Sequence, residues 1–437
     1  MTAYSPRALP SVVKDAAWVL FGQVSGRGTL FLAGAAVAWA LGAGAFADFS
    51  YLALTSATLM TVSSIGAGTA ITRYVATRPG AAAIDESSRI AASCLIGLLG
   101  GGATLILIAA LPSVVVPKAV AYLRVPLIIA LGAQLAGNLT VSVLAGERRF
   151  ASTAFANLAA GLLLISLAAL SILLRSRELV IWAIPLSQLA FFVLTARASI
   201  GFLLADFKLV RTRDVVSAMP SVLRFALPMF VTSLLATTGP WVIGLQLVSY
   251  DKAEFAAYSA GLQWFSLVLV MPGALTSAYL PRVFRDYRLS GSGETRRPES
   301  TVYGNAKLAV AIAASTAVIV LLLGNALIQF HGQVLRGHWG VFAAFVLAAV
   351  LVAPTNPLGN GLAARNGQGT WMCLTGIWWA ALLSFARLQP VDTALSAGVD
   401  FCLAYSILLL LTLGTTRLAA SRGPHRRSAS TSARIGE

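Results

Sequence analysis

The sequence is poor in the residues that build disulfide frameworks, metal centres and acid–base sites. Its 437 residues include three cysteines, three histidines and 16 acidic residues. The cysteines lie far apart within apolar runs, so they predict neither a disulfide framework nor a thiolate cluster. His331 and His338 share one short loop, but two histidines without a nearby carboxylate or thiolate make a poor metal site. We therefore expect no metal and no cofactor.

Short motifs of several enzyme classes are also missing. The chain has no G-x-x-x-x-G-K-[ST] loop, no H-E-x-x-H motif and no G-x-S-x-G motif. The glycine run at 100–102 follows no predicted strand, so it does not indicate a nucleotide-binding loop. These absences argue against ATP hydrolysis and hydrolase chemistry, and we expect a protein that is not an enzyme.

Hydrophobic residues, in contrast, dominate the chain. They make up 57% of it, only 11% of residues are charged, and the mean hydropathy is +0.80. This composition is typical of a polytopic membrane protein. Because period-two alternation is absent, we expect membrane-spanning helices and no barrel. Twelve apolar segments are long enough to span: 16–41, 49–72, 90–112, 122–145, 152–174, 180–203, 225–248, 256–280, 306–329, 340–363, 371–389 and 395–416.

The formal net charge of +16 is distributed by a membrane rule. Twelve spans divide the loops into two sets, which hold 23 and 7 basic residues, while Arg27 and Arg197 lie within spans. The richer set contains both termini, so the positive-inside rule places both termini in the cytoplasm. We expect a multi-pass protein of the bacterial cytoplasmic membrane that contacts membrane lipids and binds no nucleic acid.

The two halves of the chain echo each other. Tyr51 and Gly66 are repeated as Tyr258 and Gly273, in each case on the second span of a half. Six spans return the chain to the same side, so the halves would be parallel repeats around a central path. We predict a six-helix lobe over 1–215, a second six-helix lobe over 216–416, and a basic, disordered cytoplasmic tail over 417–437.

Three stretches carry a family resemblance. The segment 41–74, the basic loop Gly146-Glu147-Arg148-Arg149-Phe150, and the second-half elements Leu227-Pro228, Ala257-Tyr258-Ser259-Ala260 and Leu280-Pro281-Arg282 are similar to bacterial polysaccharide flippases. These belong to the multidrug/oligosaccharidyl-lipid/polysaccharide exporter superfamily. The sequence departs from the pattern at Ser50, where the family commonly has glycine. The resemblance implies two lobes that alternate in access, a polyprenyl-diphosphate-linked oligosaccharide as substrate, and glycan-assembly proteins as partners.

Arg27 is the leading candidate for substrate binding. It interrupts the uncharged run from Ala16 to Ala47, roughly 16 Å into a helix and so near the middle of a hydrocarbon core about 30 Å thick. A charge at that depth usually faces a cavity or a partner. The guanidinium fork suits a diphosphate, although a structural ion pair or snorkelling would also accommodate the residue.

Four further residues are weaker candidates. Arg73 and Arg224 end spans on the cytoplasmic side, where they could meet the phosphates or act as topology anchors. Arg197 lies close enough to a span end to snorkel. Asp400 is the only acid well within a proposed span and could bind a coupling proton or sodium ion, although exposure at the outer end is the simpler reading.

Two functional hypotheses remain open at this point. A flippase for lipid-linked oligosaccharide, driven by an ion gradient or the membrane potential, needs a cationic site. An ion-coupled multidrug/cation antiporter needs buried carboxylates. Because the N-terminal spans contain Arg27 and no acid, the sequence favours the flippase. A membrane-embedded polymerase or glycosyltransferase is disfavoured, since every predicted outer loop is short.

Overall fold

The computed structural model describes residues 8–77, 84–110, 116–208, 210–276, 298–332, 334–364, 367–388 and 392–421. Within these ranges every regular element is helical, which confirms the predicted all-helical class. The elements are α1 (Ala8–Ser64), α2 (Ala67–Thr77), α3 (Ile84–Ala110), η2 (Lys118–Leu123), α5 (Arg124–Gly146), α6 (Phe150–Leu173), α7 (Arg177–Lys208), α8 (Thr212–Tyr250), α9 (Lys252–Val268), α11 (Pro298–Leu322), α12 (Gly324–Phe330), α13 (Trp339–Val352), α14 (Thr355–Ala364), α15 (Gln368–Leu388) and α16 (Ala394–Ser421).

The predicted spans map onto these helices. Among the described residues, ten helices are long and apolar enough to span a membrane, and the bent pair Lys252–Val268 and Val270–Thr276 provides an eleventh. The 57 residues of α1 would extend about 85 Å as one straight helix, far more than a membrane thickness. Gly42 breaks α1 with a left-handed φ of 81°. The two arms of α1 therefore correspond to the first two predicted spans.

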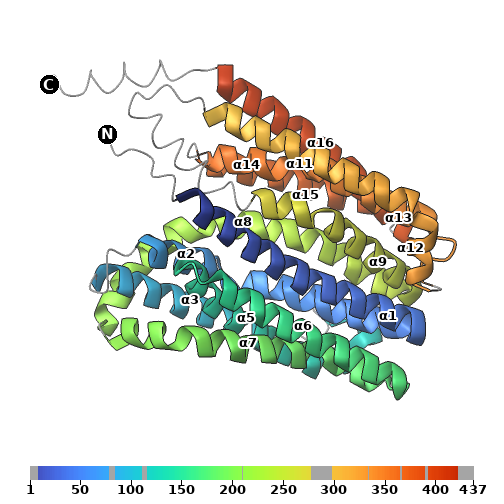
Figure 1. The fold of residues 1–437 in the computed structure, drawn as a ribbon, viewed down its shortest axis with the longest axis horizontal. Helices are drawn as coiled ribbons and strands as arrows, with labels where there is room; N and C mark the ends of the chain where they lie inside the picture. The colour runs from blue at the N-terminus through green and yellow to red at the C-terminus, as the bar shows by residue number, and fades with distance from the viewer. Residues whose placement is uncertain are drawn as a thin grey trace.

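The helices form two packed groups (Figure 1). We call α1 to α7 the N-terminal lobe and α8 to α16 the C-terminal lobe. The start of α1 and the end of α16 lie on one side, here called the termini side, which the charge pattern predicts to be cytoplasmic. The bend of α1, the α6–α7 turn and the α12–α13 connection lie on the opposite side, here called the far side.

Helices α1, α8 and α9 form most of the contact between the lobes. The two arms of α1 pack on α8 and α9, and α12 also touches α1. The first turns of α8 pack on the N-terminal lobe, where Ala218 and Val222 join an apolar cluster with Ile71 and Ile90. The proposed division between 215 and 216 therefore falls within the first turn of a continuous helix, and it stays a prediction.

Small residues bring α1 and α6 together. A Cβ on Gly161 of α6 would lie 2.4 Å from the hydroxyl oxygen of Thr29, and one on Gly22 of α1 would lie 3.3 Å from the Cα of Ala154. Only glycine permits such an approach, which is a common way to pack membrane helices without a large hydrophobic driving force. The first arm of α1 is thereby held in the N-terminal lobe.

The predicted repeat places its tyrosines at corresponding points of the chain. Tyr51 lies on the second arm of α1 and Tyr258 on α9, and both side chains are buried against Phe255. Their glycine partners differ, since Gly66 has a left-handed φ of 71° between α1 and α2 whereas Gly273 has no such backbone. The repeat of the two halves therefore stays a prediction.

Helix α16 is longer than predicted. It continues to Ser421, so residues 417–421 of the proposed disordered tail are helical, and 422–437 lie outside the described residues. The reason is visible in Thr412-Leu413-Gly414-Thr415-Thr416-Arg417-Leu418-Ala419-Ala420, which contains no proline and continues the helix past the membrane boundary.

Candidate substrate path between the two lobes

One face of α1 meets the other lobe at the far side and leaves it at the termini side. Helical spacing places Arg27, Phe31 and Gly34 on the same face. The Phe31 ring packs edge-on against Trp264 of α9, with ring centroids 4.7 Å apart. A Cβ on Gly34 would lie 2.8 Å from the amide nitrogen of Gln263, also on α9. The two lobes are therefore in contact from Phe31 toward the far side.

Arg27 lies one turn closer to the termini side on this face. Its side chain is exposed, and it makes no hydrogen bond or ion pair within the described part of the chain. A charged group at mid-membrane depth without a protein partner is expensive unless it meets water or a ligand. Helical spacing therefore places the guanidinium on the face of α1 that contacts α9, one turn beyond Phe31.

A second pair of arginines lies on that same side. The Arg73 guanidinium of α2 stacks 4.1 Å from the ring centroid of Phe225 on α8. Arg224 precedes Phe225, and both arginine side chains are exposed. The structure thus brings the Arg73 turn and the Arg224 turn together, as a basic edge on the termini side of the lobe contact.

Arg197 does not join this group. Its neighbours on the same face of α7 are Val193, Ile200 and Leu204, all of them exposed aliphatic side chains. Such a face is typical of contact with lipid. The roles of Arg197 in binding and in snorkelling both stay predictions.

The far side of the lobe contact is closed by a cluster of charges that sequence reasoning missed. Asp48 is completely buried on the second arm of α1. Its Oδ2 accepts a hydrogen bond of 2.6 Å from Nε of Arg177, and its Oδ1 accepts one from the Tyr122 hydroxyl. Lys252 of the C-terminal lobe approaches within 3.6 Å of Oδ1. The tyrosine also accepts from Arg177 at 2.9 Å and from Lys252 at 3.1 Å.

This cluster has one partner that can leave. Asp48, Tyr122 and Arg177 belong to the N-terminal lobe, whereas Lys252 begins α9 of the other lobe. Separation of the lobes would remove Lys252 while Arg177 still balances the carboxylate. Breaking a buried pair completely costs about 3–5 kcal/mol, so retaining Arg177 lets the contact open without an isolated buried charge.

The expectation that the N-terminal spans contain no acid is therefore wrong, because the first candidate span contains Asp48. Asp48 falls between the two proposed spans, but α1 runs through it and buries it between Ala47 and Phe49. Its flanking aromatic and small residues indicated burial. The basic partners were visible as Arg177 and Lys252 in predicted outer loops, but no spacing rule links residues so far apart in sequence.

Asp400 is also placed differently from the simpler expectation. Its side chain on α16 is 2% exposed, so exposure at an outer helix end is wrong. Its Oδ2 has no hydrogen-bond partner within the described residues. The residue lies within the C-terminal lobe, and its role as an ion-coupling group stays a prediction.

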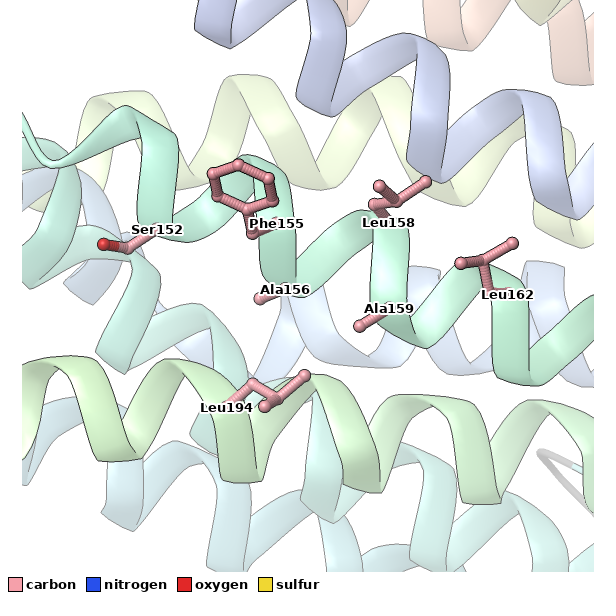
Figure 2. Close-up of a pocket in the computed structure, with 7 residues that line it drawn as sticks. All are labelled: Ser152, Phe155, Ala156, Leu158, Ala159, Leu162 and Leu194. Carbon is pink, nitrogen blue, oxygen red and sulfur yellow. The ribbon is translucent and has the colours of Figure 1, made fainter.

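A hydrophobic groove lies elsewhere, between α6 and α7 (Figure 2). Its volume is about 370 Å³, and it contains none of the candidate residues. Six of its seven lining side chains are apolar: Phe155, Ala156, Leu158, Ala159, Leu162 and Leu194, with Ser152 at one end. This chemistry does not suit a diphosphate or a sugar.

Comparison with known proteins identifies the fold. No family model matches the sequence, and no curated protein does. Among solved structures, an inward-facing multidrug resistance MATE family transporter of the MOP superfamily matches with a TM-score of 0.66 and 14% identity, covering 93% of this chain and 95% of that one. Its outward-facing counterpart gives 0.67 and 14%, covering 94% and 95%.

A third solved structure is of a different functional type. It is a MOP superfamily transporter from Pyrococcus furiosus, described as having a binding pocket of reverse polarity that suggests a different function. It matches with a TM-score of 0.65 and 16% identity, covering 94% of this chain and 95% of that one. The chain therefore has the two-lobed membrane fold of the MATE transporters of the MOP superfamily.

Proposed function

We propose that the protein moves a polyprenyl-diphosphate-linked oligosaccharide across the membrane by alternating access between its two lobes. The observation that carries this proposal is the placement of Arg27, an exposed guanidinium with no partner among the described residues, on the face of α1 that contacts α9. A planar fork of N–H donors binds phosphate oxygens in pairs, and it does so more strongly away from bulk water.

The basic edge on the termini side supplies the first step. Arg73 and Arg224 meet the headgroup where it enters, and Arg27 holds the diphosphate deeper between the lobes. The lipid tail is apolar and needs no charged binding site, so it stays in the membrane. The reversed pocket polarity described for one solved neighbour indicates that this fold accommodates pockets of differing charge.

The contact between Lys252 and the Asp48 cluster closes the far side, and its opening is the second step of the proposed cycle. In this structure α9 contacts the first arm of α1 from Phe31 toward the far side, and the first turns of α8 pack on the N-terminal lobe at the termini side. In the proposed cycle, this arrangement, with the far side in contact, is the one that loads substrate from the termini side. Translocation then requires the lobes to part at the far side and to close below Arg27. The charge cluster is the polar part of the contact that must break.

An ion-coupled multidrug/cation antiporter is the second candidate. Solved structures of multidrug resistance transporters share the fold, and the buried carboxylate of Asp400 has an oxygen without a protein partner. Such a group suits a proton or a cation. In this alternative Arg27 would repel the substrate, so its removal should leave export intact or increase it.

A translocation assay separates the two candidates. Proteoliposomes would contain the protein and a polyprenyl diphosphate that carries a fluorescent disaccharide, and an impermeant quencher would report which leaflet holds the sugar. We expect Arg27→Ala to slow translocation about 10- to 100-fold, the equivalent of a charge-assisted hydrogen bond of about 1.5–3 kcal/mol. Arg27→Lys should recover only part of the rate, because an ammonium keeps the charge but loses the paired donors.

Arg197→Ala is the matched control, since it removes an arginine of the N-terminal lobe from a lipid-facing surface. Its rate should equal that of the parent protein. An Arg27→Ala variant that translocates the probe at the parent rate would refute the proposal. Faster export of a cationic dye by the same variant would favour the antiporter.

A further inference from the structure

His331 is buried at the contact between the two lobes. It follows α12 directly, and its side chain has no exposed surface. Its ring centroid lies 5.3 Å from Phe31 and 6.1 Å from Phe46, both on α1 of the N-terminal lobe. Trp264 of α9 covers it at 5.8 Å from the C-terminal lobe. The imidazole is thus enclosed by aromatic rings from both lobes.

The backbone next to His331 is shaped for this contact. Gly332 has a left-handed φ of 60°, and a Cβ on it would lie 2.8 Å from the Cα of Trp39 on α1. The α12–α13 connection therefore presses directly on the first arm of α1. If the lobes part at the far side, the imidazole loses its cover from α1 and meets water.

The aromatic contact holds polar atoms that have no protein partner. Among the described residues neither ring nitrogen of His331 makes a hydrogen bond, and the same is true of the Trp264 indole nitrogen and Gln263 Oε1. Buried polar groups without a partner disfavour the state that buries them. The closed contact is therefore sensitive to any change in the charge of the imidazole.

No charged group in the described structure is placed to balance an imidazolium there. On α1 the flanking charges are Arg27, which has the wrong sign, and Asp48, which is engaged by Arg177. On α9 they are Lys252, also of the wrong sign, and Glu254, which accepts a hydrogen bond of 2.7 Å from the Ala394 amide. Helix α13 carries no charged residue, and in the same connection Arg336 has the wrong sign and His338 caps the start of α13.

We propose that His331 is a proton-binding site within the far-side contact, and that a proton bound there favours separation of the lobes at that side. This inference rests on the proposed alternation between two lobe arrangements. It does not depend on which substrate is moved.

The sign follows from the burial of the imidazole. Desolvation lowers the pKa of His331 from 6.5 to about 4, and the nearby Leu327 carbonyl, although it accepts no hydrogen bond of normal geometry from the ring, opposes this shift in part. An imidazole exposed by lobe separation regains an ordinary pKa near 6.5, so the open arrangement binds the proton more readily. Above about pH 6.5 the imidazole is neutral in both arrangements, so it adds no preference for the open one. As pH falls from about 6.5 to about 4, the ratio of open to closed molecules should rise by up to about tenfold per pH unit.

Distances between spin labels test this directly. Leu173→Cys at the end of α6 and Leu388→Cys at the end of α15 place labels on exposed far-side positions of different lobes, in a background where the three native cysteines are serine. In nanodiscs the parent should shift from a short to a long distance between pH 7.5 and pH 5. His331→Gln and His331→Phe should remove this pH response, and His331→Lys should give the long distance already at pH 7.5.

His338→Gln is the matched control, because it removes a second histidine from the same connection and should respond to pH as the parent does. The proposal is overturned if the parent distance does not change with pH, or if both neutral His331 variants still respond. The assay contains no substrate. Arg27→Ala should therefore keep the pH response while losing translocation, so failure of this inference and failure of the proposed function can be told apart.

Discussion

The two ends of one face of α1 have opposite chemistry. Toward the far side the face is covered by Trp264 and the imidazole of His331, which pack on Phe31. Toward the termini side the same face carries Arg27, which is exposed and has no partner among the described residues. In a helix with a purely structural role, we would expect the side chains at both ends of this face to have protein partners. The difference indicates that one end closes a contact while the other waits for a ligand.

The largest effect should come from Asp48→Asn. The substitution leaves Arg177 and Lys252 facing each other without a counter-charge. We expect a loss of about 3 kcal/mol in the free energy of unfolding, the lower end of the range for a broken buried pair, because Arg177 is half exposed. Thermal unfolding of the purified protein in detergent measures it.

Lys252→Gln separates the contribution of the C-terminal lobe to the Asp48 cluster from that of Arg177. It removes the partner contributed by the other lobe but keeps the Asp48–Arg177 pair, so stability should fall by about 1 kcal/mol or less. The spin-label distance across the far side should nonetheless lengthen. Equal losses of stability in the two variants would contradict the view that Lys252 is the dispensable partner.

A smaller effect should come from Gly332→Ala. Its left-handed backbone strains any side chain, and the new methyl would also press on the Trp39 backbone, so the far side should open further. Gly337→Ala carries the same strain, with a φ of 83°, but meets nothing within 4 Å. Only the first variant should change the label distance. If both change it equally, the α12–α13 connection does not press on α1 in the way described.

Much of the fold could be predicted from hydropathy alone. Apolar segments separated by basic loops predicted the helices. The depth of Arg27 in the first span could be predicted from its distance to the start of the apolar run. These features depend on local composition and helical spacing, which the sequence displays directly.

The closed side of the site could not be predicted in the same way. Asp48, Tyr122, Arg177 and Lys252 are separated by tens to hundreds of residues, and only tertiary packing brings them together. His331 looked like a loop histidine because it follows the end of an apolar run and precedes Gly332 and Gln333, whereas its burial comes from α1 and α9. Asp400 was misplaced for a related reason, since burial by other helices cannot be inferred from distance to a span end.

Chemical labelling at position 27 tests the central claim most directly. The claim is that this position faces an aqueous space between the lobes, open to the termini side. Arg27→Cys should react with a membrane-impermeant thiol reagent added from that side, whereas Leu32→Cys, equally exposed but on the lipid-facing part of α1, should not. Labelling of Arg27→Cys with Leu32→Cys silent would support the account. An unreactive Arg27→Cys would contradict it, as would equal labelling of both positions.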